Sequence, residues 1–197
     1  PLDHKELCNQ LLPYDLKPGQ YILSVGTIEP RKNLTALINA FSQLPAKLRE
    51  RYPLVIAGMR GWKESSIMKS IEPLREKGLI RVLGYVPEEA LRTLYSGARV
   101  FAFPSIYEGF GMPVIEAMAC GTPVIASDCS SLPEVVGDSG ILLNPYDNNK
   151  WKDSLLEIIS DDDKCEDMKA RGLKRASLFS WDKTAKKTYL VYCQITG

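Results

Sequence analysis

The sequence predicts an α/β fold built on a doubly wound parallel sheet of about six strands. Short apolar runs alternate with segments whose apolar residues recur at helical spacing. The runs read as strands buried on both faces, as parallel strands are. They span residues 21–25, 54–57, 80–83, 100–103, 122–126 and 141–143. The alternation implies βαβ units and therefore a Rossmann-like sheet with helices on both sides.

The chain has the size and composition of one domain. It contains 197 residues, of which 45% are hydrophobic, which is enough for a proper core. We expect residues 1–19 to form a lead-in or linker, because Pro13, Pro18 and Gly19 interrupt it. Residues 20–197 then form the main domain together with its C-terminal helices.

Charge and residue usage exclude several function classes. The net charge is +1, so no nucleic-acid or membrane partner is indicated by charge. No apolar run is long enough to cross a bilayer, and the polar start does not read as a signal peptide. The five cysteines show no metal-ligand spacing, and His4 is the one histidine in the chain. We therefore expect a reduced, cytoplasmic compartment and no metal site.

The central stretch, residues 100–127, predicts a strand, a glycine loop, a helix and a second strand. Gly109 and Gly111 let the backbone approach a ligand closely. The helix is expected over residues 112–120, with Pro113 in its first turn. Free N–H groups at the start of this helix, together with its dipole, favour a bound anion.

Two carboxylates bracket this anion site. Glu108 precedes the glycines, and Glu116 lies early in the helix. A carboxylate only accepts hydrogen bonds, so it can grip both hydroxyls of a vicinal diol. The combination suggests a phosphorylated, sugar-rich ligand such as a nucleotide sugar. The alternative is that the acidic residues merely complement the helix dipole.

A basic pair follows the first predicted strand. Arg31 and Lys32 lie at a strand-to-helix turn, where open parallel sheets bind ligands. Two cations there suit a diphosphate, with Arg as a fork and Lys as a point charge. Asn33 is expected to cap the following helix. The alternative is a solvated pair on a loop.

Two segments resemble a known family. Residues 108–126, EGFGMPVIEAMACGTPVIA, closely resemble the E-x7-E region of family four retaining glycosyltransferases, which have the GT-B fold. Residues 24–34, SVGTIEPRKNL, resemble the motif with which the family's C-terminal domain clamps the donor phosphates. One departure is Thr27, which stands where many members have Arg. The resemblance covers roughly residues 20–195 and implies the C-terminal, donor-binding half of such an enzyme.

The resemblance also implies roles for individual residues. Arg31 and Lys32 would hold the diphosphate and stabilise the leaving group, and Glu108 would approach the transferred sugar. Glu116 would hold the ribose, while Val86 and Glu88 would lie along the base. The remaining expected donor-binding residues are Gly26, Thr27, Gly109, Phe110, Gly111 and Met112. No metal or other cofactor is expected, since the cations and the helix end neutralise the phosphates.

The expected partners are a nucleotide-sugar donor and an absent N-terminal domain that binds the acceptor. Without that domain the chain would be inactive, and any peripheral membrane contact would depend on it. In GT-B enzymes the final helix, here starting near Trp181, crosses back to that domain. In this chain we expect it either to be displaced or to dock on its own domain. Residues 27–33, TIEPRKN, look most like the mannosyltransferase branch, which favours GDP-mannose and a role in polysaccharide biosynthesis.

Three other interpretations remain at this stage. A nucleotide-sugar epimerase or a sugar phosphorylase would have a similar site, although the central loop carries no lysine for a phosphorylase cofactor. The chain would also behave as a non-catalytic nucleotide-binding module if isolated. A dehydrogenase is disfavoured, because no G-x-G-x-x-G follows the first strand.

Overall fold

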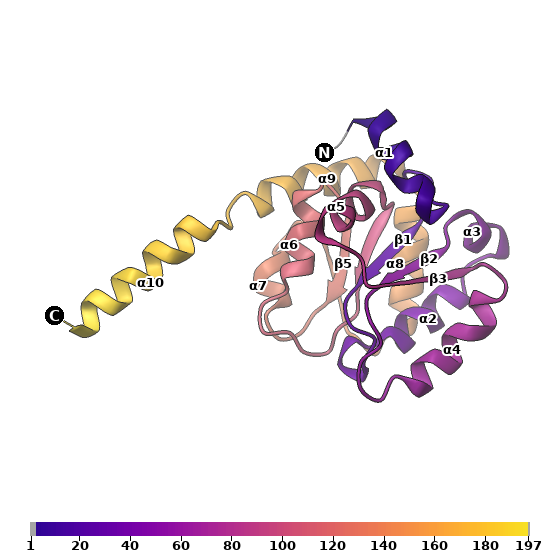
Figure 1. Ribbon diagram of the computed structural model, residues 1–197, viewed down its shortest axis with the longest axis horizontal. Helices are drawn as coiled ribbons and strands as arrows, with labels where there is room; N and C mark the ends of the chain where they lie inside the picture. The colour runs from indigo at the N-terminus through magenta and orange to yellow at the C-terminus, as the bar shows by residue number, and fades with distance from the viewer. Residues whose placement is uncertain (1–2, 197) are drawn as a thin grey trace.

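The computed structural model describes residues 3–196, without the side chains of His4 and Thr196. Within that range six parallel strands form one sheet in the order β3-β2-β1-β4-β5-β6 (Figure 1). The strands are β1 (Ile22–Val25), β2 (Leu54–Ala57), β3 (Ile80–Gly84), β4 (Val100–Phe103), β5 (Val124–Ser127) and β6 (Ile141–Leu143). The predicted α/β fold and six-stranded parallel sheet are confirmed.

Helices connect the strands and follow the last of them. The α-helices are α1 (His4–Leu11), α2 (Leu34–Ser42), α3 (Ala46–Arg51), α4 (Ser65–Arg75), α5 (Glu88–Gly97), α6 (Met112–Ala119), α7 (Leu132–Val136), α8 (Asn148–Ser160), α9 (Asp162–Ala176) and α10 (Trp181–Thr196). Short 3-10 helices, η1 (Leu12–Tyr14) and η2 (Pro30–Lys32), follow α1 and precede α2. The fifth strand starts later than expected, and Thr122 instead donates its hydroxyl to the carbonyl of Tyr95 at 2.6 Å.

The sheet is buried on both faces, as the unbroken apolar runs predict. Ile22 and Leu23 are neighbours in β1 but belong to separate cores on opposite faces. Buried side chains of α2, α4 and α8 pack on one face, and those of α1, α5, α6 and α7 pack on the other. Helices thus cover both faces of the sheet, while the carboxyl ends of its strands remain open to a ligand.

The segment expected to be a lead-in is packed on the domain from residue 3 onward. Helix α1 lies against α5 (Figure 1), and Leu7, Leu11 and Leu16 are buried. The packing is close: a Cβ at Gly97 of α5 would lie 2.7 Å from a methyl carbon of Leu11. A helix this short is marginal by itself, so its apolar face needs this support.

Beyond its first turn, helix α10 lies apart from the rest of the structure. It projects away from the sheet and its covering helices (Figure 1), and its described side chains are all exposed. They include Tyr189, Leu190 and Ile195, at 67%, 59% and 75% exposure. Helix α10 thus does not dock on its own domain. Among residues 3–196, no helix has the length and hydropathy needed to cross a bilayer.

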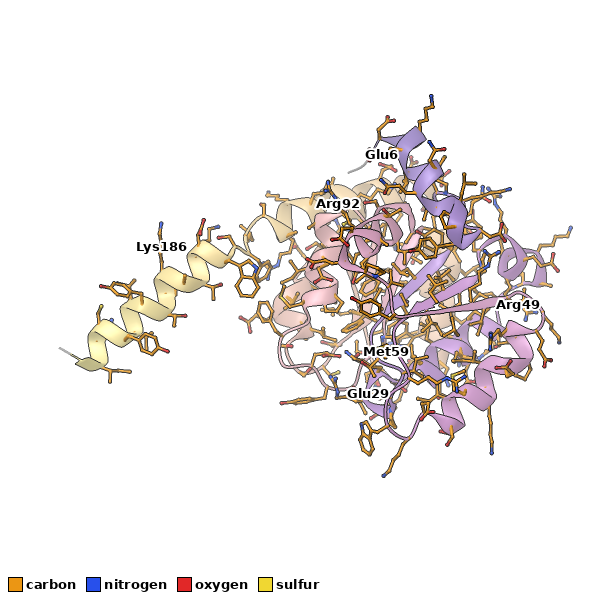
Figure 2. All side chains as sticks on the ribbon, viewed as in Figure 1. Glu6, Glu29, Arg49, Met59, Arg92 and Lys186 are labelled. Atoms are coloured by element: carbon orange, nitrogen blue, oxygen red, sulfur yellow. The ribbon has the colours of Figure 1, made fainter. Side chains whose placement is uncertain are left out.

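Two glycines bring the loops after β1 and β2 into contact. A Cβ at Gly58 would lie 2.0 Å from the carbonyl oxygen of Gly26, so no side chain fits there. Beyond this point the amide of Ile28 donates to the carbonyl of Met59 at 2.8 Å. The two loops therefore run together, and Glu29 and Met59 lie near each other in Figure 2.

We predict that Gly58→Ala destabilises the domain by about 3 kcal/mol, because the added methyl must push the two backbones apart. Denaturant unfolding measures this difference. Gly109→Ala is the control, since its added Cβ would meet no atom within 4 Å. Equal free energies of unfolding for the two variants would contradict the close approach.

Candidate functional site

The candidate site lies at the carboxyl ends of β1 and β4, where the strand order reverses. From β1 the chain moves outward to β2, whereas β4 lies on the other side of β1. Such a switch point leaves a crevice between the loops, and open α/β sheets bind ligands there. The amide of Ile106 donates to the carbonyl of Arg31 at 3.0 Å and joins the loops after β4 and β1.

Four charged side chains form an ion cluster in this crevice. The amine of Lys32 lies 2.6 Å from Oε1 of Glu108, and Nη1 of Arg31 lies 2.9 Å from Oε2. The other edge of Arg31 donates from Nε and Nη2 to Oε1 of Glu29, at 3.1 and 2.7 Å. Each oxygen of the Glu108 carboxylate therefore holds one cation, and the four formal charges cancel.

The surroundings hold this cluster in place. The amine of Lys32 lies 4.9 Å from the centre of the Phe103 ring. The side chains of Lys32 and Glu108 are only 12% and 10% exposed. Burial by itself would raise the pKa of Glu108, but the hydrogen bond from Lys32 and the charges of Lys32 and Arg31 lower it below its usual value of 4.5.

The backbone of the glycine loop is fixed by the loop after β5. The amide of Glu108 donates to Oγ of Ser130 at 3.0 Å. The hydroxyl of Ser131 donates to the carbonyls of Glu108 and Phe110, at 3.0 and 2.8 Å. A sequence pattern gives little sign of these serines, because polar loop residues are common and their partners lie more than twenty positions away.

Helix α6 begins directly after this loop. Its N-cap is Gly111, whose φ of 104° lies in the left-handed region that favours glycine. No side chain caps the helix, so the positive end of its dipole is open to an anion. Pro113 has no N–H, and the amide of Val114 donates to the carbonyl of Gly111 at 3.0 Å. The structure thus sets an uncapped helix start beside the ion cluster, as the sequence predicts.

Glu116 lies in a second part of the site, between α5 and α6. The buried hydroxyl of Tyr95 donates to Oε2 of Glu116 at 3.0 Å. Together with Glu88, Leu91 and Arg92, these residues line a depression of about 350 Å³. Burial, and secondarily the Glu116 charge, raises the pKa of Tyr95, so this phenol stays a hydrogen-bond donor.

Sequence reasoning missed Tyr95 as a site residue. Helical spacing predicts that it points inward with Leu91 and Leu94, and Tyr95 is indeed buried. Its hydroxyl nevertheless reaches a carboxylate on another helix. Hydrophobic periodicity predicts which face of a helix is buried, but it does not predict which polar group of a neighbouring element that face contacts.

Other expected site residues line two further depressions. Gly26, Thr27 and Val86 line one of about 290 Å³, which also contains the exposed Tyr85. Leu91 lines both this depression and the one with Glu116, so the two are adjacent. The expected base-side and ribose-side residues thus lie next to each other.

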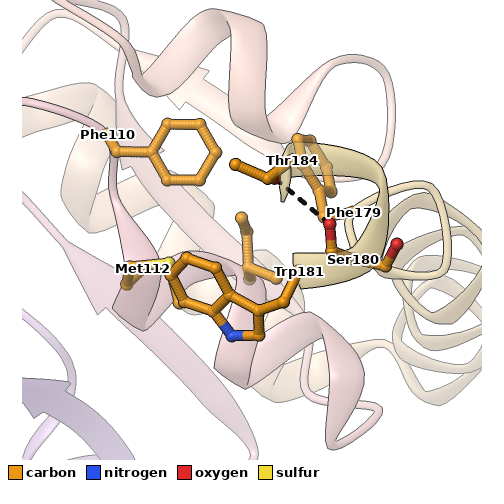
Figure 3. A pocket seen from close by; sticks show the side chains of 7 residues that line it. Phe110, Met112, Phe179, Ser180, Trp181 and Thr184 are labelled. Carbon is orange, nitrogen blue, oxygen red and sulfur yellow. Dashed lines mark hydrogen bonds between the residues drawn. The ribbon is translucent and has the colours of Figure 1, made fainter. Parts of the chain in front are cut away.

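The side chains of Phe110 and Met112 occupy a different place. They line an apolar pocket of about 120 Å³ together with Phe179, Trp181 and Thr184, at the junction of α9 and α10 (Figure 3). The rings of Phe110 and Phe179 pack edge to face with centroids 6.0 Å apart. Only the backbone of this part of the loop is therefore left to face a ligand over α6.

Asn33 does not cap helix α2 with its side chain, which corrects the prediction. Its φ of 51° is left-handed because the 3-10 helix η2 turns the chain just before α2. The side-chain amide instead donates to the carbonyl of Pro145 at 2.8 Å. Among residues 3–196, no cluster of His, Cys, Asp or Glu has the arrangement of a metal site.

Comparison with known proteins bears on this geometry. The family model described as Glycosyl transferases group 1 matches residues 15–175. An O-antigen chain mannosyltransferase B from Escherichia coli is 44% identical over 192 residues, which cover 98% of this chain and 50% of that protein. A serotype-specific mannosyltransferase WbdA, also from Escherichia coli, is 37% identical over 172 residues, covering 85% of this chain and 21% of that protein.

Solved structures show the same fold. Sucrose-phosphate synthase from Thermosynechococcus elongatus is 29% identical with a TM-score of 0.80, covering 98% of this chain and 51% of that one. The Anabaena protein HepE, solved with UDP and glucose, has a TM-score of 0.85 at 19% identity, covering 98% and 53%. This chain therefore spans about half the length of mannosyltransferase B and of these two structures, and about a fifth of the length of WbdA.

The lowered pKa of Glu108 predicts how the stability of the domain depends on pH. In the unfolded chain this carboxyl titrates near 4.5. Because the folded pKa is lower, the ion cluster stabilises the domain above that pH and loses its contribution as pH falls through the folded value.

We expect the difference in free energy of unfolding between the native chain and Glu108→Gln to shrink from pH 6 to pH 3. Urea unfolding at each pH measures it, and other acidic groups cancel in the difference. If the free energies of unfolding of the two proteins change in parallel with pH, the lowered pKa of Glu108 is refuted.

Proposed function

The chain belongs to the family Glycosyl transferases group 1, and on this premise we propose that it is the donor-binding half of a retaining glycosyltransferase. Its substrate is a nucleoside-diphosphate sugar. The observation that carries the proposal is the meeting of two cations with an uncapped helix start at the switch point of the sheet. That combination suits a diphosphate.

Each part of the site has a proposed role. Arg31 and Lys32 bind the diphosphate and stabilise the negative charge that develops on the leaving group. The backbone amides of Gly109, Phe110 and Gly111 face the phosphate or the sugar. Glu108 accepts hydrogen bonds from the transferred sugar and favours positive character at its anomeric carbon. With the cations and the helix end neutralising the phosphates, no metal is required.

The nucleoside is proposed to occupy the two adjacent depressions. Glu116 accepts hydrogen bonds from the ribose hydroxyls, and the hydroxyl of Tyr95 donates a hydrogen bond to the same carboxylate. The base lies along Val86 and Glu88, near Gly26 and Thr27. The proposal gains support from Leu91, which borders both depressions and so puts base and ribose side by side.

We propose GDP-mannose as the donor. The relatives from Escherichia coli are named as mannosyltransferases. Their names do not favour an epimerase or a non-catalytic module. O-antigen synthesis is the matching process for the full protein, which we place in the cytoplasm, at the membrane surface if its other half makes such a contact.

The other half of the relatives is proposed to be an acceptor-binding domain. The chain matches 50% of one relative's length, which leaves room for a second domain of similar size. The exposed apolar side chains of α10 are proposed to contact that domain. This half by itself then binds donor but transfers no sugar.

The first prediction concerns donor choice. Calorimetric titration of the chain with GDP, UDP and ADP, each with and without its sugar, will show selective binding of the GDP forms. Glu116→Ala will abolish the binding, because the ribose loses its acceptor. Selective binding of UDP would contradict the mannosyl donor, while binding of none would contradict the donor-half assignment.

The second prediction concerns the phosphates. Lys32→Ala will weaken GDP at least tenfold and leave guanosine nearly unchanged, since a charge-assisted hydrogen bond contributes about 1.5–3 kcal/mol. Lys69→Ala is the matched control, because Lys69 is an exposed lysine of α4. Equal losses of affinity for GDP and guanosine would contradict the proposal that Lys32 binds the diphosphate.

A further inference from the structure

The phosphate-binding cations are already occupied in this structure. Lys32 and Arg31 each donate to a different oxygen of Glu108, at 2.6 and 2.9 Å. Arg31 also donates to Glu29 and to the carbonyl of Tyr107. The site that should attract an anion is thus electrically neutral and contains a carboxylate at its centre.

The backbone of Glu108 is held beside the two cations. Ser130 and Ser131 bind its backbone amide and carbonyl, both at 3.0 Å. Lys32 passes over Gly26, where a side chain would crowd it, and its amine lies 4.9 Å from the centre of the Phe103 ring. An incoming phosphate therefore meets cations whose hydrogen bonds already go to Glu108, and it must share them with that carboxylate or displace it.

The free-energy cost of sharing the two cations depends on whether the bound ligand carries a sugar. A nucleoside diphosphate without sugar adds negative charge beside Glu108 and offers it nothing in exchange. A sugar offers hydroxyl donors, which can replace the cations as partners of the carboxylate. Lys32 and Arg31 then become free to turn to the phosphates.

We infer that Glu108 is a specificity-determining residue that makes the site prefer the loaded donor to the spent nucleoside diphosphate, by competing with the diphosphate for Arg31 and Lys32. This inference rests on the proposed function. When the sugar has been transferred, its hydroxyls leave Glu108. The carboxylate then returns to the two cations and favours release of the product.

The test compares the native chain with Glu108→Gln by calorimetry. The amide keeps the size of the side chain but removes its charge. Three probes are titrated: inorganic pyrophosphate, GDP and GDP-mannose. The variant is expected to bind pyrophosphate and GDP at least tenfold more tightly, and its ratio of GDP-mannose to GDP affinity is expected to fall by the same factor or more.

Two further variants sharpen the test. Glu166→Gln removes one exposed carboxylate on α9, outside the site, and should leave all three affinities unchanged. Glu108→Asp keeps the charge but is one carbon shorter, so it cannot reach both cations equally well. It should tighten GDP by a smaller factor, and it provides the same comparison if Glu108→Gln does not fold.

The outcomes separate the two claims. If native chain binds GDP-mannose but the Glu108 variants bind GDP and pyrophosphate no more tightly, the competition is overturned and the proposed function stands. If neither the native chain nor the variants bind any nucleotide or nucleotide sugar, the proposed function fails, and the preference for loaded donor fails with it.

Discussion

The parallel pairing of β1 with β4 is the constraint on which the site depends. Ile22 lies opposite Val100, so strands that are far apart in sequence become neighbours at the centre of the sheet. Their following loops are thereby forced together, and Arg31 meets Tyr107 and Glu108 across the crevice. The two cores on either side of the sheet stabilise this pairing, since a slip of one residue would move each buried side chain into the opposite core.

Four charged side chains occupy this crevice. Oppositely charged groups with little solvent access need good geometry to offset their desolvation, and here each carboxylate oxygen of Glu108 has its own cation. Around them, serine hydroxyls and an aromatic ring supply the remaining support. The result is a preorganised site whose charges balance before any ligand arrives.

Much of the fold follows from sequence because its signals are local. The run at residues 100–103 becomes β4 without change, and the helix expected from Met112 begins there, because unbroken apolar runs and glycine stops act on near neighbours. Contacts between distant loops carry no such signal. The pairing of Glu108 with Lys32 and the bond from Tyr95 to Glu116 join groups 76 and 21 positions apart, and only the folded chain reveals them. Asn33 fails as a cap for the same reason, since its acceptor on Pro145 lies 112 positions away.

The contact between Phe110 and Phe179 has a mechanical consequence. Phe110 belongs to the glycine loop, and Phe179 lies just before α10. Helix α10 has 16 residues and is therefore about 24 Å long. Acting as a lever pivoted at these rings, it would convert a tilt of about 10° into a displacement of about 4 Å at its far end. A small shift of the loop would in this way become a larger shift at the C-terminal end of α10.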